Sequence, residues 1–387
     1  MRSIYLDYNS TTPLAGAVRQ AMTPFLGELI AAPGNPHWLS RAIEEAIEDS
    51  RNHVSMMLDC MPSEIIFTSG GTESINLALL GYARTIPRKS YSRSKPQMIL
   101  SSVEHAPVSR VADFLQTQGW EITRLPCRAD GAVEVDALRS AIGKRTRLIS
   151  IQLANEQIGT VQEIAMMARL PRPKSAMFHT DATQAMGKIN VDVEALGIDM
   201  LSLSGHKMYA PKGSGALYVR SGITLESLMH GGCQENGLRP GSENTPAIVG
   251  LGIASQLVKS AGEESAERLS KLSNNFLTQL EQAADETFTA HGHPRNRLPN
   301  TLSLVLKNRS ALSILRRTPE LFLGLAVSSP IPSPQSYPST IFHSIAVPFE
   351  EAIATIRVSV GWNTTEHEIE TAAKLLGEAY QQTEPNH

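Results

Sequence analysis

Short apolar runs alternate with amphipathic segments from about residue 65 to residue 219, and this alternation limits the possible folds more than any other feature. Strands are predicted at 65–67, 98–100, 148–153, 176–179, 200–203 and 216–219, with helices between them at 72–82, 106–118 and 163–169. This order predicts a mostly parallel sheet covered by helices. Such sheets bind ligands at the carboxyl ends of their strands, so polar residues at those ends are the candidates for function.

The pattern changes after Pro246 and predicts a second, smaller domain of the α+β class. Long helices are predicted over 246–285, then strands near 302–306, 321–327 and 356–360, with helices near 310–317 and 365–382. We therefore divide the chain into an N-terminal arm that packs with the small domain (1–14), a large domain (15–262) and a small C-terminal domain (263–387).

Composition excludes several classes of protein. A net charge of −3 over 387 residues gives no general attraction to nucleic acid or to a membrane surface. One local basic cluster is interpreted as a solvated loop: Arg84, Arg88, Lys89, Arg93 and Lys95. The three cysteines lack paired spacing, which favours a reducing compartment and argues against a zinc site. No signal peptide or membrane-spanning run is visible, so a cytoplasmic location is expected.

A lysine and an aspartate follow two of the predicted strands. Lys207 lies in the sequence Ser-Gly-His-Lys directly after the strand at 200–203. A partly desolvated amine in such a place suits a Schiff-base lysine, although a lone lysine in a turn is more often a surface residue. Asp181 follows the strand at 176–179. Pyridoxal phosphate needs this pair, a lysine on its aldehyde and an aspartate on its pyridinium nitrogen.

Other strand ends and loops carry residues that suit the same cofactor. Gly71 and Thr72 open a predicted helix, where free N–H groups can bind a phosphate, although Thr72 also suits a plain helix cap. His105 could stack on a flat ring and move protons, or it could be structural. Asn155 could bond a phenolic oxygen or a substrate carboxylate, or it could satisfy the backbone of its own loop.

Two later residues could bind anions. Ser242 lies in a glycine-rich polar loop over residues 230–244 and could reach a phosphate. Arg357 lies inside an apolar strand and could bind a carboxylate with both arms of its guanidinium group, or it could lie on an exposed strand face.

The order and spacing of these motifs resemble those of cysteine desulfurases and selenocysteine lyases, which belong to the class V aminotransferase group. The resemblance covers nearly the whole chain, and residues 298–301 and 347–349 are particularly similar to the selenocysteine lyase branch. The motifs that carry it are the Gly70-Gly71-Thr72 loop, His105, Asn155, Asp181-Ala182-Thr183-Gln184, Ser204-Gly205-His206-Lys207, Arg239-Pro240-Gly241-Ser242-Glu243-Asn244 and Arg357.

This resemblance implies an α/β fold of the fold type I pyridoxal-phosphate transferases. The large domain would contain a mostly parallel seven-stranded sheet and would be followed by a smaller α+β C-terminal domain. Lys207 would hold the cofactor and move protons, Asp181 would keep the ring nitrogen protonated, and His105 would stack on the ring. Gln184 and Asn155 would bond the phenolic oxygen.

The resemblance also implies the contacts of the phosphate and of the substrate. The phosphate would be held by Gly71, Thr72, Ser204 and His206. Ser242 would reach the phosphate of a partner subunit, so a homodimer is expected. The substrate carboxylate would be bound by Arg357, Asn35 and Asn155. A sulfur-acceptor protein is a further expected partner.

The chain departs from the family at the cysteine that normally attacks the substrate sulfur or selenium. The matching position is Ser333 or Ile331, depending on the direction of counting, and no cysteine follows Cys233. One interpretation is β-elimination, which gives pyruvate, ammonia and a thiol. In a second, Cys233 is a substitute nucleophile, although a cysteine in such a place is more often a buried small residue. In a third, the chain is a weakened paralogue that acts as a scaffold, and in a fourth the reaction is transamination or racemisation.

Smaller departures concern the neighbourhood of the expected substrate. Glu156-Gln157 stands where the family usually has Asn-Glu, and His37-Trp38 replaces small residues.

The prediction from the sequence is a pyridoxal-phosphate enzyme that cleaves the Cβ–S or Cβ–Se bond of cysteine or a cysteine-like amino acid.

Overall fold

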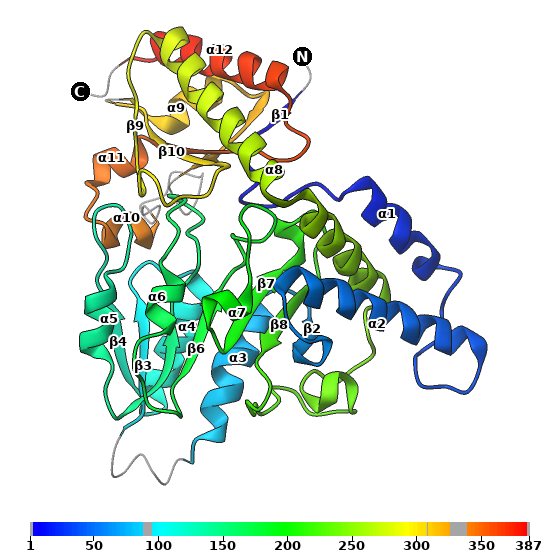
Figure 1. Ribbon diagram of the computed structural model, residues 1–387. Coiled ribbons are helices and arrows are strands. Elements are labelled where there is room, and N and C mark those ends of the chain that lie inside the picture. The colour runs from blue at the N-terminus through cyan, green and yellow to red at the C-terminus, as the bar shows by residue number, and fades with distance from the viewer. Residues whose placement is uncertain (1–2, 88–94, 308, 326–338, 385–387) are drawn as a thin grey trace.

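The chain forms two blocks of structure that lie one above the other in Figure 1. The computed structural model describes residues 3–87, 95–307, 309–325 and 339–384. The lower block holds a large sheet and most helices, and the upper block holds the C-terminal elements. Helix α8 runs from one block to the other.

A seven-stranded sheet forms the centre of the lower block, in the order β2-β8-β7-β6-β5-β3-β4. Its strands are β2 (Ile65–Thr68), β3 (Gln97–Ser101), β4 (Glu121–Leu125), β5 (Thr146–Ser150), β6 (Met177–Asp181), β7 (Met200–Ser204) and β8 (Gly215–Val219). Strands β4, β3, β5, β6 and β7 pair in parallel, whereas β8 is antiparallel to both β7 and β2. The predicted mostly parallel sheet is therefore confirmed.

Both faces of this sheet are buried, because successive side chains of a strand point to opposite faces. In β3, Met98 and Leu100 belong to one hydrophobic cluster and Ile99 belongs to another. In β2, Ile66 packs on one side and Phe67 on the other. Continuous apolar runs in the sequence, rather than alternating ones, are the result.

Helices cover both faces of the sheet. Helices α3 and α4 pack in the cluster of Met98, whereas residues of α2, α6 and α8 pack in the cluster of Ile99. The helices of this block are α1 (Gly16–Met22), η1 (Thr23–Leu26), α2 (Trp38–Leu58), η2 (Pro62–Glu64), α3 (Gly71–Thr85), α4 (Ala106–Thr117), α5 (Val135–Ala141), α6 (Ile164–Ala168), α7 (Val193–Leu196), η4 (Gly205–Lys207) and η5 (Gln234–Gly237).

The upper block contains an antiparallel sheet in the order β12-β13-β10-β9. Its elements are β9 (Thr289–Ala290), β10 (Thr301–Val305), α9 (Ala311–Arg317), β12 (Gly324–Leu325), α10 (Thr340–Ser344), α11 (Phe349–Ile353), β13 (Thr355–Ser359) and α12 (Glu366–Gln382). The N-terminal strand β1 (Ile4–Tyr5) pairs in parallel with β11 (Leu321–Phe322). The first residues of the chain are thus anchored to its last quarter.

Helix α8 (Thr245–Ala284) contributes to both hydrophobic cores. Its first half packs in the large core, for example through Leu251, and its second half packs in the small core through Phe276. The backbone leaves helical geometry at Gly262, where φ is 50° and ψ is −149°. We propose that this glycine separates the two domains, at the boundary that the sequence predicts.

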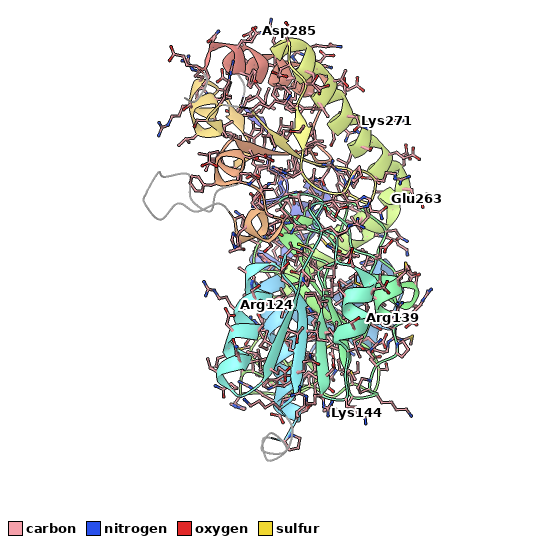
Figure 2. All side chains as sticks on the ribbon, turned by 90° about the vertical axis from the view of Figure 1, so that its left-hand side faces the viewer. Arg124, Arg139, Lys144, Glu263, Lys271 and Asp285 are labelled. Carbon is pink, nitrogen blue, oxygen red and sulfur yellow. The ribbon has the colours of Figure 1, made fainter. Side chains whose placement is uncertain are left out.

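Charged side chains of both signs point outward from both blocks, as Figure 2 shows for Arg139 and Lys144 below and for Glu263 and Lys271 along α8. No helix in the described ranges is long and apolar enough to cross a membrane. The proline-rich stretch with Ser333 and Ile331 lies outside the described residues, as do several members of the basic cluster.

Candidate active site

A cavity of about 370 Å³ opens where the strands β2, β3, β6 and β7 end. It brings together many of the residues that the sequence predicts around the cofactor: Gly71, Thr72, His105, Gln184, Ser204, His206 and Lys207. The other lining residues are Ser69, Gly70, Glu73, Glu156, Thr183, Lys212 and Gly213.

Lys207 lies in η4, directly after the buried strand β7. Its Nζ donates hydrogen bonds to the carbonyl oxygens of Asn9, at 2.5 Å, and of Ser10, at 2.9 Å. Burial lowers the pKa of Lys207 to about 8, while the carboxylate of Glu156 opposes this shift and Arg357 adds to it. The amine is therefore more often neutral, and more nucleophilic, than an ordinary lysine at neutral pH.

Asp181 ends β6 and is only 3% exposed. Its Oδ1 accepts hydrogen bonds from the backbone N–H (2.9 Å) and the hydroxyl (2.6 Å) of Thr183, and its Oδ2 lies 3.6 Å from Nδ1 of His105. Burial alone would raise the pKa of Asp181, but His105 and Thr183 outweigh burial and lower it. A buried carboxylate that stays ionised is what a pyridinium nitrogen requires.

The pKa of His105 moves in the opposite direction. Burial would lower it, but the carboxylates of Asp181 and Glu156 outweigh burial, so the pKa is raised. The 3.6 Å separation between His105 and Asp181 is an ion-pair contact rather than a hydrogen bond. His105 can therefore carry a proton at the edge of the cavity.

The N-terminus of α3 forms the anion-binding side of the cavity. Gly70 has a φ of 150°, and a Cβ added at Gly71 would lie only 2.6 Å from Cγ2 of Thr183. The absence of side chains leaves the free N–H groups of this helix open to a ligand. Burial and nearby lysines lower the pKa of His206 to about 4, so its imidazole is neutral. The amine, the ionised carboxylate and this helix end together fit pyridoxal phosphate.

Asn155 differs from the other predicted cofactor residues, because it is fully buried and does not line this cavity. Its Oδ1 accepts from the backbone N–H groups of Gln157 (2.9 Å) and Ile158 (3.1 Å), and its Nδ2 donates to the carbonyl of Val103. These contacts support the alternative in which Asn155 satisfies its own loop, and its predicted bonds to the cofactor and the substrate stay predictions. Glu156 is the residue of this loop that faces the cavity.

Arg357 is buried and ion-paired, so the alternative of an exposed strand face does not apply. Its Nη2 donates to Oδ1 of Asp7 (2.6 Å) and to Oγ of Ser10 (2.7 Å). It does not line the cavity, and neither does Asn35, whose side chain is exposed before α2. The predicted role of both residues in binding the substrate carboxylate stays a prediction.

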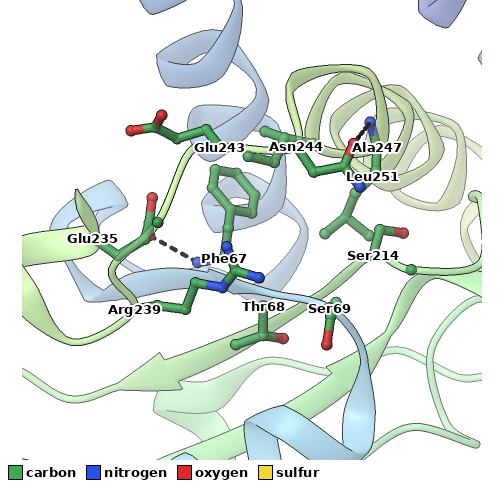
Figure 3. A pocket seen from close by; sticks show the side chains of 14 residues that line it. Phe67, Thr68, Ser69, Ser214, Glu235, Arg239, Glu243, Asn244, Ala247 and Leu251 are labelled. Atoms are coloured by element: carbon green, nitrogen blue, oxygen red, sulfur yellow. Dashed lines mark hydrogen bonds between the residues drawn. The ribbon is translucent and has the colours of Figure 1, made fainter. Parts of the chain in front are cut away.

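The loop that holds Cys233 and Ser242 is attached to β2 by Glu235. Oε2 of Glu235 accepts from the backbone N–H of Phe67 at 2.8 Å, the dashed contact at the left of Figure 3, and its two oxygens accept from Arg51 at 2.8 Å each. Ser242 is exposed on this loop and does not line the cavity of Lys207, so its contact across a dimer stays a prediction.

Cys233 is exposed, so the interpretation as a buried small residue is wrong. It lines a second cavity with Arg51 and Glu235 and does not line that of Lys207. Within one chain, the structure therefore does not bring this thiol to the amine.

Sequence reasoning missed three contributors to the site. The carbonyl of Asn9 accepts from Lys207, Thr183 fixes Asp181, and Glu156 contributes a carboxylate. Thr183 could have been found from its place two residues after Asp181. The contact of Asn9 leaves no sign in the sequence, because it uses a backbone oxygen.

Residues 4–371 match the family model of aminotransferase class V. The chain belongs to this family. Among curated members, it is 38% identical to the cysteine desulfurase IscS of Dictyoglomus turgidum over 97% of the chain and 94% of that relative. It is also 38% identical to the mitochondrial cysteine desulfurase of Arthroderma benhamiae, over 97% of the chain and 74% of the relative.

Solved structures of two similar proteins have the same fold. A NifS-like protein matches with a TM-score of 0.88 and 30% identity, over 97% of this chain and 98% of that one. The structure of SspA in complex with cysteine matches with a TM-score of 0.79 and 35% identity, over 92% and 99% of the two chains. This member of the class V family is thus a pyridoxal-phosphate-dependent enzyme with the fold type I architecture, as the sequence predicts.

Proposed function

We propose that this enzyme cleaves the Cβ–S or Cβ–Se bond of cysteine or a cysteine-like amino acid. The observation that carries the proposal is the partly neutral amine of Lys207 in one cavity with His105, which contacts the ionised Asp181. The relatives named cysteine desulfurases, and the related structure of SspA in complex with cysteine, support an amino-acid substrate.

Each residue would have one task in this reaction. Pyridoxal phosphate, when bound, supplies an electron sink for the carbon atoms of an amino acid. Asp181 holds the proton on the ring nitrogen, and the N-terminus of α3 binds the phosphate. Lys207 Nζ takes the proton from Cα of the substrate and returns it. His105, with its raised pKa, would give a proton to the departing group or take one from an attacking thiol.

Cleavage of the Cβ–S bond can have two outcomes, and the atoms balance in both. If an external thiol takes the sulfur, cysteine and the thiol give alanine and a persulfide. If no thiol takes it, β-elimination with water gives pyruvate, ammonia and sulfide. The absence of any cysteine after Cys233 favours the second outcome as an alternative function, because a serine hydroxyl is a weak nucleophile at neutral pH.

The partners and the location of the enzyme belong to the same proposal. A homodimer would bring Ser242 of one chain to the phosphate site of the other, and its exposure on a loop supports this. A sulfur-acceptor protein would be needed only if alanine is the product. The cytoplasm remains the expected location.

A product assay tests the proposal. Purified, cofactor-loaded protein is incubated with cysteine, selenocysteine and an S-substituted cysteine, with and without an added thiol, and alanine and pyruvate are quantified. Alanine supports desulfurase or selenocysteine lyase activity, and pyruvate supports the β-elimination alternative. Neither product from any substrate would contradict both and favour a scaffold. Lys207→Ala is the inactive control, and Cys233→Ala shows whether this thiol takes part.

A further inference from the structure

Lys188 is a buried lysine that the proposed chemistry does not use. It follows Gln184 by four residues, its side chain is 6% exposed, and it belongs to no ion pair among the described residues. Its Nζ donates to the backbone oxygen of Gln184 at 3.0 Å and to Oε1 of the same residue at 2.8 Å. Both hydrogen bonds therefore fall on one residue of the cavity wall.

The protonation of Lys188 agrees with these two contacts. Burial lowers its pKa well below the ordinary value, and the charges of Lys207 and Arg357 lower it further. A neutral amine has two N–H groups, and Gln184 offers two acceptors. A buried ammonium would keep a third N–H without a partner, which costs free energy.

Gln184 is held at both ends of its amide. Lys188 donates to Oε1, while Nε2 donates to the carbonyl oxygen of Asn9 at 3.0 Å. The same carbonyl accepts from Lys207 at 2.5 Å. Nε2 carries two hydrogens, and the carbonyl oxygen of Asn9 accepts one of them. The second hydrogen is therefore available to a ligand in the cavity that Gln184 lines.

We propose that Lys188 is a positioning residue, which fixes the amide of Gln184 so that one N–H points at the bound cofactor. This inference rests on the proposed function only in placing the cofactor at Lys207. An oxygen anion of the cofactor that accepts this N–H is stabilised by it. Without Lys188, Oε1 of Gln184 loses its donor, and the amide rotates to find another.

The test is a pH titration of the visible absorption of the holoenzyme, which does not depend on the substrate or the product. In Lys188→Met, the loss of the donor makes the cofactor oxygen more basic. The pH midpoint of the colour change should therefore rise by roughly one unit. Lys188→Gln keeps an amide donor and should restore most of the wild-type midpoint.

A double-mutant cycle separates positioning from a direct effect of Lys188. Gln184→Leu alone should raise the midpoint as Lys188→Met does, and the double variant should show no further rise. Additive shifts, or an unchanged midpoint in Lys188→Met, would overturn the proposal. If Lys188→Met does not fold by circular dichroism, Lys188→Leu takes its place in the cycle. A wild-type protein without visible absorption would instead contradict the placement of the cofactor at Lys207.

Discussion

Single side chains set the charge of this active site, and Glu156 is one that acts on two of its basic groups. Its carboxylate faces the cavity and raises the pKa of both Lys207 and His105. Among the described residues, this carboxylate has no hydrogen-bond or ion-pair partner, so its charge acts on Lys207 and His105 from a distance. The sequence marks this position only as a departure from the family.

Glu156→Gln should make Lys207 reactive at lower pH. Removing the carboxylate leaves burial and Arg357 to lower the pKa of Lys207 further, so the neutral amine persists to lower pH. When cofactor-free protein is mixed with pyridoxal phosphate, the midpoint of the pH profile for its incorporation, followed by absorbance, should fall by about one unit.

Glu73→Gln is the matched control for this change. Glu73 lines the same cavity, but Arg239 already pairs with it at 3.1 Å. Its neutralisation should leave the midpoint near the wild-type value. Equal shifts in the two variants would mean that any negative charge at the cavity acts on Lys207, and the special role given to Glu156 would be lost.

At the scale of single elements, the start of α3 combines close packing with ligand binding. The contact between Gly71 and Thr183 leaves no room for a Cβ, since its distance to Cγ2 would be 2.6 Å. A substitution at Gly71 must therefore move the helix end or the loop that follows Asp181 at the end of β6.

Gly71→Ala should weaken cofactor binding. The overlap costs about 1–3 kcal/mol of stability, and the shift that relieves it displaces the N–H groups of the helix end. A loss of about 1 kcal/mol in their contact with the phosphate would raise the dissociation constant of pyridoxal phosphate about fivefold. The double variant Gly71→Ala/Thr183→Ser should recover much of the affinity, because serine removes Cγ2 and keeps the hydroxyl bonded to Asp181. Absorbance titration of cofactor-free protein measures both constants, and a double variant as weak as the single one would disprove the steric explanation.

The elements differ in how well the sequence predicts them, for a physical reason. Strands buried on both faces, such as β7, appear as continuous apolar runs and are predicted. Strand β4 lies at the edge of the sheet and is mostly half-exposed, with the sequence Glu-Ile-Thr-Arg-Leu, so no apolar run marks it. The short helix α5 buries little beyond Leu138 and was also not predicted.

At the scale of the whole molecule, Asn9 connects the arm to both blocks. Its Nδ2 donates to the carbonyl of Glu156 at 3.0 Å and to Oγ1 of Thr301 at 2.9 Å, and its Oδ1 accepts from Asn300 at 3.1 Å. One buried amide thus joins the loop of the active site to the strand β10.

Asn9→Ala should destabilise the protein by about 3 kcal/mol, because it leaves several buried polar groups without a partner. Chemical denaturation followed by circular dichroism measures this loss. Asn52→Ala removes the same amide from an exposed position of α2 and should change stability little. Equal effects of the two substitutions would rule out the proposed connection.

The part of the site that the sequence could predict has signals close by in the sequence, whereas the rest depends on contacts between distant residues. Lys207, Asp181 and His105 follow strand ends, where the fold brings them together, and they could be predicted. The place of Glu156 on the cavity wall could not, because neighbouring loop residues point in different directions. The pairing of Arg357 with Asp7 spans 350 positions and has no local signal.

The arm also has a consequence for the order of events during protein synthesis. The arm contacts Arg357 and Ser359 across 350 positions of the chain, and its carbonyl oxygens at Asn9 and Ser10 hold Lys207. The ribosome makes the arm first and β13 among the last strands. A nascent chain that stops before β13 therefore has its lysine but lacks the contacts of Arg357 and Ser359 with the arm. The arm should thus reach its final place against Lys207 only once β13 has been made.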